Sequence, residues 1–260
     1  LFVLASLMLS VLVAFKQAEP VYIDIDTPEG DSFSLRIAED PETLDNVKTT
    51  SGAAEGVMAL TFAERLIYID QENVIHGWLA EDWEISADQR EVTFFLREGI
   101  KFTDGTDFNA DAVKFHFDRI LDKSNASPAR AYYGSLLEVV VIDAYTVKMV
   151  FEEPFAGLWN VLSYAYSGFN SPTAVEKWGD EYGRHPVGTG PFMLKEWLPG
   201  SRLTFVRTPD YIQVRQDATN SGPALLAQIV FQVIPEDGTA MAALLTGELQ
   251  ASVLNSDTLP

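Results

Sequence analysis

The stretch LREGIKFTDGTDFNADAVKFHFDRIL, residues 96–121, places four acidic or amide side chains within eight residues: Asp104, Asp107, Asn109 and Asp111. Three interpretations compete: a metal-binding loop, a catalytic carboxylate cluster, and a strand that turns into a helix. A calcium loop that starts at Asp107 requires glycine at its sixth position and glutamate at its twelfth. Ala112 and Asp118 occupy those positions, so the stretch departs from the calcium pattern.

The pattern instead favours a turn followed by a capped helix. Asp104-Gly105 is a typical tight-turn dipeptide. Asn109 can accept a hydrogen bond from an amide of the first helical turn, and the carboxylate of Asp111 suits the positive end of the helix dipole. We therefore predict a helix over residues 110–122. Its apolar stripe consists of Val113, Phe117, Ile120 and Leu121.

Other candidates for chemistry have simpler explanations. The glycine-rich HPVGTGP (185–191) places Pro191, which has no N–H, where a phosphate loop needs a donor, and we interpret it as a structural turn. The chain has no cysteine and no nucleophile-turn motif. We expect no catalytic residue, no metal and no cofactor. Three histidines lack metal-ligand spacing: His76, His116 and His185.

The charge restricts the possible partners. Lys and Arg number 18 against 38 Asp and Glu, which gives a formal net charge of -20. Such a surface repels phosphate backbones, so we expect no nucleic-acid partner.

The first residues predict export. LFVLASLMLSVLVAF is an apolar run of the length of a signal-peptide core, shorter than a membrane span of roughly 20 residues. We therefore interpret residues 1–18 as a signal-like segment, with an uncleaved anchor and a buried helix as alternatives. Residues 19–31 are acidic, contain Pro28 and Gly30, and are predicted to form a flexible leader.

The remainder alternates hairpins with helices, which predicts a mixed α/β fold. A strand is expected over 32–38, and a hairpin over 78–97 with Ile85 among its core residues. Further hairpins are expected at 138–154 and 190–209, and a strand and helix at 225–249. The segment LWNVLSYAYSGF (158–169) is rich in aromatic residues. It suits either a ligand cleft, through Tyr164 and Tyr166, or an ordinary core helix followed by a surface loop.

Two segments make the order of elements recognisable. GWLAEDWEISADQREVTFFLREGIKFTDGTDFNADAVKFHFDRI and HPVGTGPFMLKEWLPGSRLTFVRTPDY resemble the extracellular solute-binding proteins of family five, the peptide-, nickel- and opine-type receptors of ABC importers. IVFQVIPEDGTAMAALLTGELQASV resembles the strand and helix that follow in that family. The chain departs from the family at Ala112, where aspartate is frequent, and at Ile212, where tryptophan is usual.

The resemblance implies a lobe of the periplasmic-binding-protein type (class II, type C) that ends before the second lobe. Residues 32–58 and 172–260 would form its main subdomain, and residues 59–171 a smaller inserted subdomain. The resemblance also implies ligand contacts from the loop after the first strand and from two tyrosine-containing segments. The candidate residues are Glu39, Asp40, Thr43, Tyr132, Tyr133, Tyr164 and Tyr166.

By the same resemblance, we expect a monomeric periplasmic receptor without catalytic activity. It would capture a small molecule or peptide between two closing lobes and deliver it to an inner-membrane ABC permease. Oligopeptides or dipeptides are the default solute, while nickel chelates, opines, oligosaccharides and glutathione stay open. The alternatives are a secreted hydrolase with an acidic pair, and a solute receptor that signals to a membrane sensor.

Overall fold

The structure is a computed structural model that describes residues 19–26, 30–220 and 222–253. The expected signal-like segment 1–18 lies outside the described residues. Within them, no helix has both the length and the apolar character needed to cross a membrane. The strands are β1 (Val21–Tyr22), β2 (Ser32–Ile37), β3 (Ile67–Ile69), β4 (Ile75–Gly77), β5 (Ala80–Ile85), β6 (Glu91–Leu96), β7 (Leu136–Asp143), β8 (Thr146–Phe151), β9 (Phe192–Leu198), β10 (Arg202–Arg207) and β11 (Gln228–Val233).

The helices connect these strands, as a mixed α/β fold requires. The α-helices are α1 (Gly52–Leu60), α2 (Ala110–Leu121), α3 (Leu158–Ser163), α4 (Pro172–Trp178) and α5 (Asp237–Thr246). Short 3-10 helices are η1 (Lys123–Asn125), η2 (Pro128–Tyr133), η3 (Ala165–Ser167) and η4 (Gly179–Arg184).

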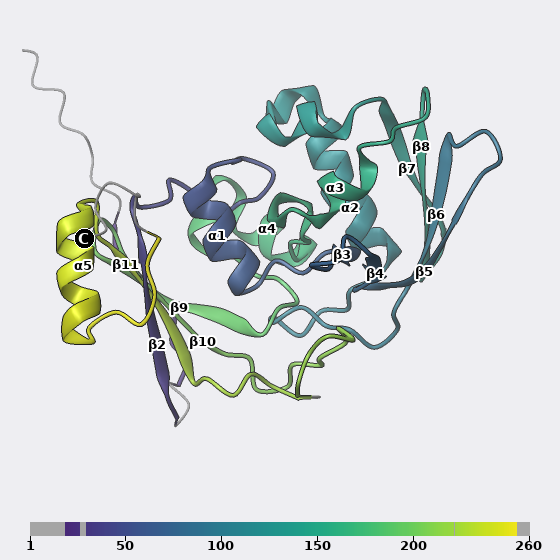
Figure 1. The fold of residues 1–260 in the computed structure, drawn as a ribbon. Coiled ribbons are helices and arrows are strands. Elements are labelled where there is room, and N and C mark those ends of the chain that lie inside the picture. Colours follow the sequence, from purple (N-terminus) through teal and green to yellow (C-terminus); the bar gives the residue numbers. More distant parts are fainter. Residues whose placement is uncertain (1–18, 27–29, 221, 254–260) are drawn as a thin grey trace, which may run out of the picture.

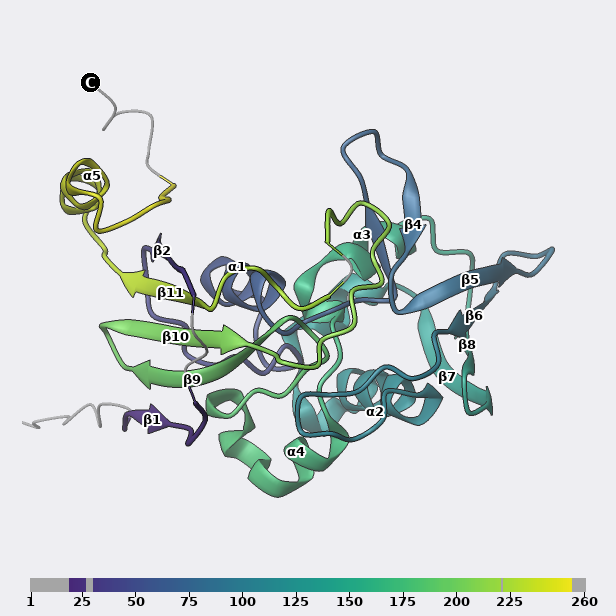
Figure 2. The ribbon, with the colours of Figure 1, turned by 90° about the horizontal axis from the view of Figure 1, so that it is seen from below.

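Two sheets lie at opposite ends of the molecule (Figure 1). The larger sheet has the strand order β1-β9-β10-β11-β2 and is antiparallel except for the β11–β2 pair. Helix α5 lies on its outer side, and α1 on the side that faces the rest of the protein (Figure 1, Figure 2). The smaller sheet has the order β5-β6-β8-β7, and a third, two-stranded sheet pairs β3 with β4.

The predicted hairpins are confirmed, because each consists of two amphipathic strands around a short turn. In β6, Val92, Phe94 and Leu96 alternate with less buried residues and face the core. The prediction for Ile85 was wrong: this side chain is 50% exposed near the end of β5.

The expected flexible leader also needs correction. Val21 and Tyr22 form β1, which pairs with Trp197 and Glu196 of β9. The pairing continues at Ile23, whose amide donates to the carbonyl of Lys195 over 2.8 Å. Val21 is buried, so its apolar side chain stabilises this edge of the sheet.

The acidic stretch from Asp104 to Asp111 forms a turn and a helix cap. Asn109 accepts the amide of Ala112 over 3.0 Å at the start of α2. Asp104 accepts from the amide of Thr106 at 3.0 Å and from the Ser171 hydroxyl at 2.5 Å. Asp107 pairs instead with Lys101 on the surface. The carboxylates therefore serve separate local roles and do not converge on a common point.

The two largest of four clusters of buried apolar side chains lie beneath the two larger sheets. Residues 61–62 and 188–192 run side by side. The amides of Gly190 and Phe192 donate to the carbonyls of Phe62 and Thr61 at 3.1 and 3.2 Å. The predicted boundary between residues 58 and 59 falls inside α1, just before this junction.

Glycine is required at this junction because the two backbones approach each other closely. A Cβ added to Gly188 would lie 2.2 Å from the carbonyl oxygen of Phe62. We expect Gly188→Ala to lower the free energy of unfolding by at least about 2 kcal/mol, measured by urea denaturation. Gly56→Ala is the matched control. No atom lies within 4 Å of a Cβ at Gly56, in the middle of α1, so this change should stabilise by about 0.5–1 kcal/mol. Equal effects of the two variants would contradict the close approach.

Candidate functional site

Three of the predicted site residues stack on one another. The ring centroids of Tyr132 and Tyr166 lie 5.1 Å apart with planes at 18°, and those of Tyr166 and Tyr164 lie 5.3 Å apart with planes at 17°. Tyr132 and Tyr164 are each 48% exposed, while Tyr166 is 5% exposed between them. Stacked aromatic rings stabilise each other and present a broad, rigid contact surface. We call these three residues the tyrosine face.

Tyr133 has a different position from its neighbour. Its side chain is fully buried in the apolar cluster beneath the smaller sheet, and its hydroxyl contacts the hydroxyl of Ser167 at 2.7 Å. This contact joins η2 to η3, the two elements that carry Tyr132 and Tyr166. Ser167 in turn donates to the carbonyl of Val161 in α3 at 2.6 Å. Tyr133 therefore positions the tyrosine face and has no free surface for a ligand.

The three candidate residues of the first loop lie elsewhere. Asp40 accepts from the indole nitrogen of Trp197 at 2.8 Å and from the amide of Gly200 at 2.6 Å, so both carboxylate oxygens anchor the β9–β10 hairpin. Thr43 is half-buried and accepts the amide of Asp45 at 3.1 Å. Glu39 is exposed. The structure does not bring these residues into contact with the tyrosine face.

Two buried groups with shifted pKa values, Glu64 and His116, have structural roles in the core. Burial raises the pKa of Glu64, but its carboxylate accepts hydrogen bonds from Tyr211, Thr189 and Trp78 at 2.6, 2.7 and 3.0 Å. Because three donors satisfy this buried carboxylate, Glu64 has a structural role. His116 is 1% exposed, and its ring lies close to the backbone of Tyr166. It packs edge-on against Phe117 and Phe169.

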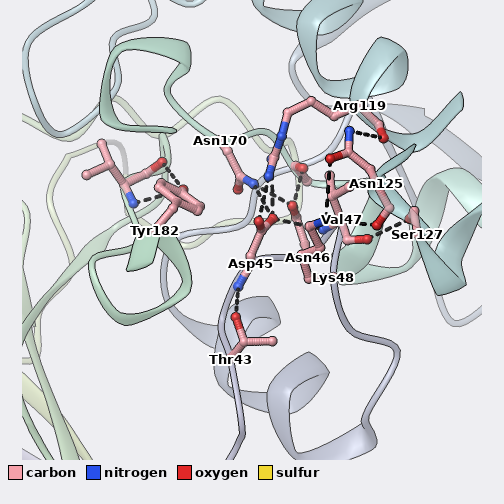
Figure 3. Close-up of polar contacts among 12 residues, drawn as sticks. Thr43, Asp45, Asn46, Val47, Lys48, Arg119, Asn125, Ser127, Asn170 and Tyr182 are labelled. Carbon is pink, nitrogen blue, oxygen red and sulfur yellow. Dashed lines mark hydrogen bonds and ion pairs between the residues drawn. The ribbon is translucent and has the colours of Figure 1, made fainter. Parts of the chain in front are cut away.

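A buried ion pair connects the loop before α1 to helix α2 (Figure 3). Asp45 lies in the loop before α1, and the guanidinium of Arg119, near the end of α2, reaches its carboxylate at 2.5 Å. The side chains are 6% and 13% exposed. Asp45 also accepts the amide of Val47 at 3.1 Å and the side-chain amide of Asn170 at 3.3 Å.

Neighbouring residues extend this connection. Asn170 donates to the side chain of Asn46 at 2.7 Å, and Asn46 donates to the carbonyl of Gly168 at 2.5 Å. Ser127 donates to the carbonyl of Val47 at 2.6 Å, next to η2. We call Asp45, Asn46, Arg119, Ser127 and Asn170 the polar clasp. It fixes η2 and the segment after η3 against the loop that leads to α1.

Sequence reasoning missed both the clasp and Glu55 of α1. The amide of Ala165 donates to the Glu55 carboxylate at 3.4 Å, which places this acid beside the tyrosine face. No local pattern marks either feature, because the partners are far apart along the chain.

The mixed α/β fold described above is similar to that of known solute-binding proteins. Residues 74–260 match the family model "Bacterial extracellular solute-binding proteins, family 5 Middle". The glutathione-binding protein GsiB of Shigella flexneri is 37% identical over 210 residues, which cover 80% of this chain and 39% of that protein. The chain therefore belongs to the family 5 bacterial extracellular solute-binding proteins.

Solved structures support the same fold. A periplasmic binding protein, AgaA of A. tumefaciens R10 in complex with agropinic acid, is 26% identical with a TM-score of 0.74; the match covers 84% of this chain and 43% of AgaA. A dipeptide-binding protein of Pseudoalteromonas sp. SM9913 in complex with Met-Leu is 24% identical with a TM-score of 0.77, over 88% and 48% of the two chains. The chain thus spans less than half the length of the relatives it matches.

The polar clasp generates a stability prediction. Asp45→Ala leaves the Arg119 guanidinium buried without its counter-ion, and we expect a loss of about 3–5 kcal/mol in the free energy of unfolding, measured in urea. Asp107→Ala is the control, because the Lys101–Asp107 pair has side chains 59% and 62% exposed; it should cost less than about 1 kcal/mol. Similar losses in both variants would show that the Asp45 pair contributes no more than a surface pair.

His116 generates a prediction of pH dependence. Burial, with a smaller effect of the charge on Arg119, lowers the pKa of His116 from 6.5 to about 3. Below pH 6.5 the unfolded chain takes up a proton at this position while the folded chain does not, so stability falls as pH falls toward 3. At pH 5 we expect this effect to cost about 2 kcal/mol relative to pH 7.

Urea denaturation of the wild type and of His116→Leu at pH 7 and pH 5 checks the effect. The difference between the two pH values should shrink by about 2 kcal/mol in the variant. His185→Gln is the control, because His185 is only partly buried and its removal leaves His116 in place. An unchanged pH dependence in His116→Leu would contradict the assignment.

Proposed function

We propose that this chain is one lobe of an extracytoplasmic receptor of an ABC importer. The receptor captures an oligopeptide or dipeptide and delivers it to an inner-membrane permease. The single observation that carries the proposal is an exposed, rigid tyrosine face on a chain that belongs to family 5. Such a face gives a ligand a large contact area at low entropic cost, because tyrosine has few rotatable bonds.

The mechanism is differential binding without covalent chemistry. A ligand that touches the tyrosine face and an opposing lobe at the same time stabilises the closed arrangement over the open one. One lobe alone supplies only part of these contacts, so we expect it to bind its solute weakly.

Peptides are the preferred solute class for two reasons. Two of the relatives and neighbours reported above are described with a peptide ligand, namely glutathione and Met-Leu. Stacked tyrosines also suit peptides, since the rings pack against apolar side chains while the hydroxyls hydrogen-bond to polar groups. A periplasmic location after export, a monomeric state and the absence of catalytic activity complete the proposal.

Variants of the tyrosine face test the proposal. In calorimetry or ligand-detected NMR with Met-Leu, the chain should bind at millimolar concentration, and the double variant Tyr132→Ala/Tyr164→Ala should weaken binding at least about tenfold, since each ring contributes on the order of 1 kcal/mol. Tyr22→Ala is the control, because Tyr22 is 68% exposed and lies on β1, at the edge of the larger sheet.

Two results would contradict the proposal. Unchanged affinity in the double variant would place the ligand elsewhere. Cleavage of Met-Leu into its two amino acids, detected by mass spectrometry, would favour the alternative function as a secreted hydrolase. Recovery of intact dipeptide is the expected result.

A further inference from the structure

A small apolar pocket lies between the turn before α2 and the larger sheet. The turn supplies Ile100 and Phe102, strand β9 supplies Met193, and the segment after β10 supplies Tyr211 and Ile212. The pocket has a volume of about 190 Å³. The residues that line it are different from the three of the tyrosine face, so this pocket is separate from the candidate solute site.

Three hydroxyl groups of the pocket lining already have hydrogen-bond acceptors. Those of Tyr211 and Thr189 donate to the buried carboxylate of Glu64 at 2.6 and 2.7 Å. The hydroxyl of Thr208 donates to the carbonyl of Gly190 at 3.0 Å. A polar ligand group would lose its hydrogen bonds to water without gaining equivalent bonds from these side chains. The walls therefore favour an apolar ligand.

The two charged side chains of the lining lie at its exposed rim. Lys101 forms an ion pair with Asp107 at 2.5 Å, and both side chains are largely exposed. Asp210 is exposed as well. These charges remain in water, and a ligand that carried its own charge would lose hydration when it entered the pocket. The expected ligand is therefore neutral.

The apolar side chains of the pocket suit an aromatic ring. Phe102 and Tyr211 are buried, Met193 is half-buried, and Ile212 is 53% exposed. The thioether of a methionine makes favourable contacts with aromatic rings. A ring bound here would also remove apolar surface of Ile212 from water. Apolar cavities of about 150 Å³ accommodate benzene, so the size of this pocket fits a slightly larger ring compound.

From these observations we infer that the pocket is a second ligand site, which binds a small neutral aromatic compound of about the size of toluene. Ile100 and Phe102 belong to the apolar cluster beneath the smaller sheet, and Met193 lies on β9 of the larger sheet. A ring between them contacts both parts of the fold and stabilises the folded chain, because it binds the folded state alone. The inference is independent of the proposed function, since it concerns other residues and another class of ligand.

Two probes of nearly the same shape test the site. Toluene is neutral, whereas N-methylpyridinium carries a permanent positive charge on a ring of similar size. The chain is labelled with carbon-13 in its methionine methyl groups, and the signal of Met193 is assigned with the variant Met193→Gln. Each probe is titrated by NMR up to the solubility limit of toluene, and the melting temperature is measured with and without toluene.

We expect toluene to shift the Met193 methyl signal with a dissociation constant of about 1 mM, because a ligand of so few atoms gains limited affinity. Near saturation it should raise the melting temperature by about 2–4 °C. N-methylpyridinium should bind at least about tenfold more weakly, because its charge would lose hydration.

Variants of two methionines show where toluene binds. Met193→Gln keeps the length of the side chain but replaces the thioether with an amide, and it should weaken toluene binding about fivefold, as judged by the change in melting temperature. Met241→Gln is the matched control. Met241 is a partly exposed methionine on α5, outside the pocket lining, and its variant should keep the wild-type affinity.

Three results would overturn the inference: an unchanged Met193 signal in the presence of toluene, equal affinities of the two probes, and an unchanged toluene affinity in Met193→Gln. The methyl groups of Met58 and Met149, both buried in the core, serve as internal references. Toluene that shifted these signals and left Met193 unchanged would have entered the core and missed the pocket. The wild-type comparison of the two probes decides the matter even if Met193→Gln does not fold.

Discussion

The ion pair between Asp45 and Arg119 is the constraint on which the geometry of the site depends. It joins the loop before α1 to the end of α2. A carboxylate removed from water must be fully compensated. Asp45 meets this requirement with Arg119, the Val47 amide and Asn170. Movement of this loop away from α2 and from the segment after η3 would break the bonds to Arg119 and Asn170 together.

The clasp matters because it holds the elements that carry the tyrosine face. Ser127 and Asn46 bond η2 and the segment after η3 to the loop that leads to α1, and η2 and η3 carry Tyr132 and Tyr166. Rings held in a fixed arrangement require supporting residues of this kind. Tyr133 has a similar supporting role through its contact with Ser167.

Local features of the fold could be predicted from the sequence, whereas the convergence of the site could not. The N-cap at Asn109 and the hairpin turns depend on neighbours a few residues away, so short sequence patterns predict them. The pairing of Asp45 with Arg119 spans 74 residues and leaves no periodic signal.

The candidate tyrosines illustrate the same limit. Adjacent residues Tyr132 and Tyr133 are equally plausible in the sequence, yet one is half-exposed and the other fully buried. Which of them faces outward depends on how η2 packs against η3, which is a tertiary contact. Asp40 is a candidate ligand residue because of its position in the family pattern. Only the fold shows that its carboxylate accepts hydrogen bonds from the Trp197 indole and from the hairpin turn at Gly200.

The close backbone approach at Gly188 and Gly190 has an evolutionary consequence. Added Cβ atoms would lie 2.2 and 2.3 Å from carbonyl oxygens of Phe62 and Thr61, so the crossing of the two segments is set by main chain against main chain. Any side chain at Gly188 or Gly190 would meet main-chain atoms of the other segment, so sequence change is expected at other positions and not at this crossing.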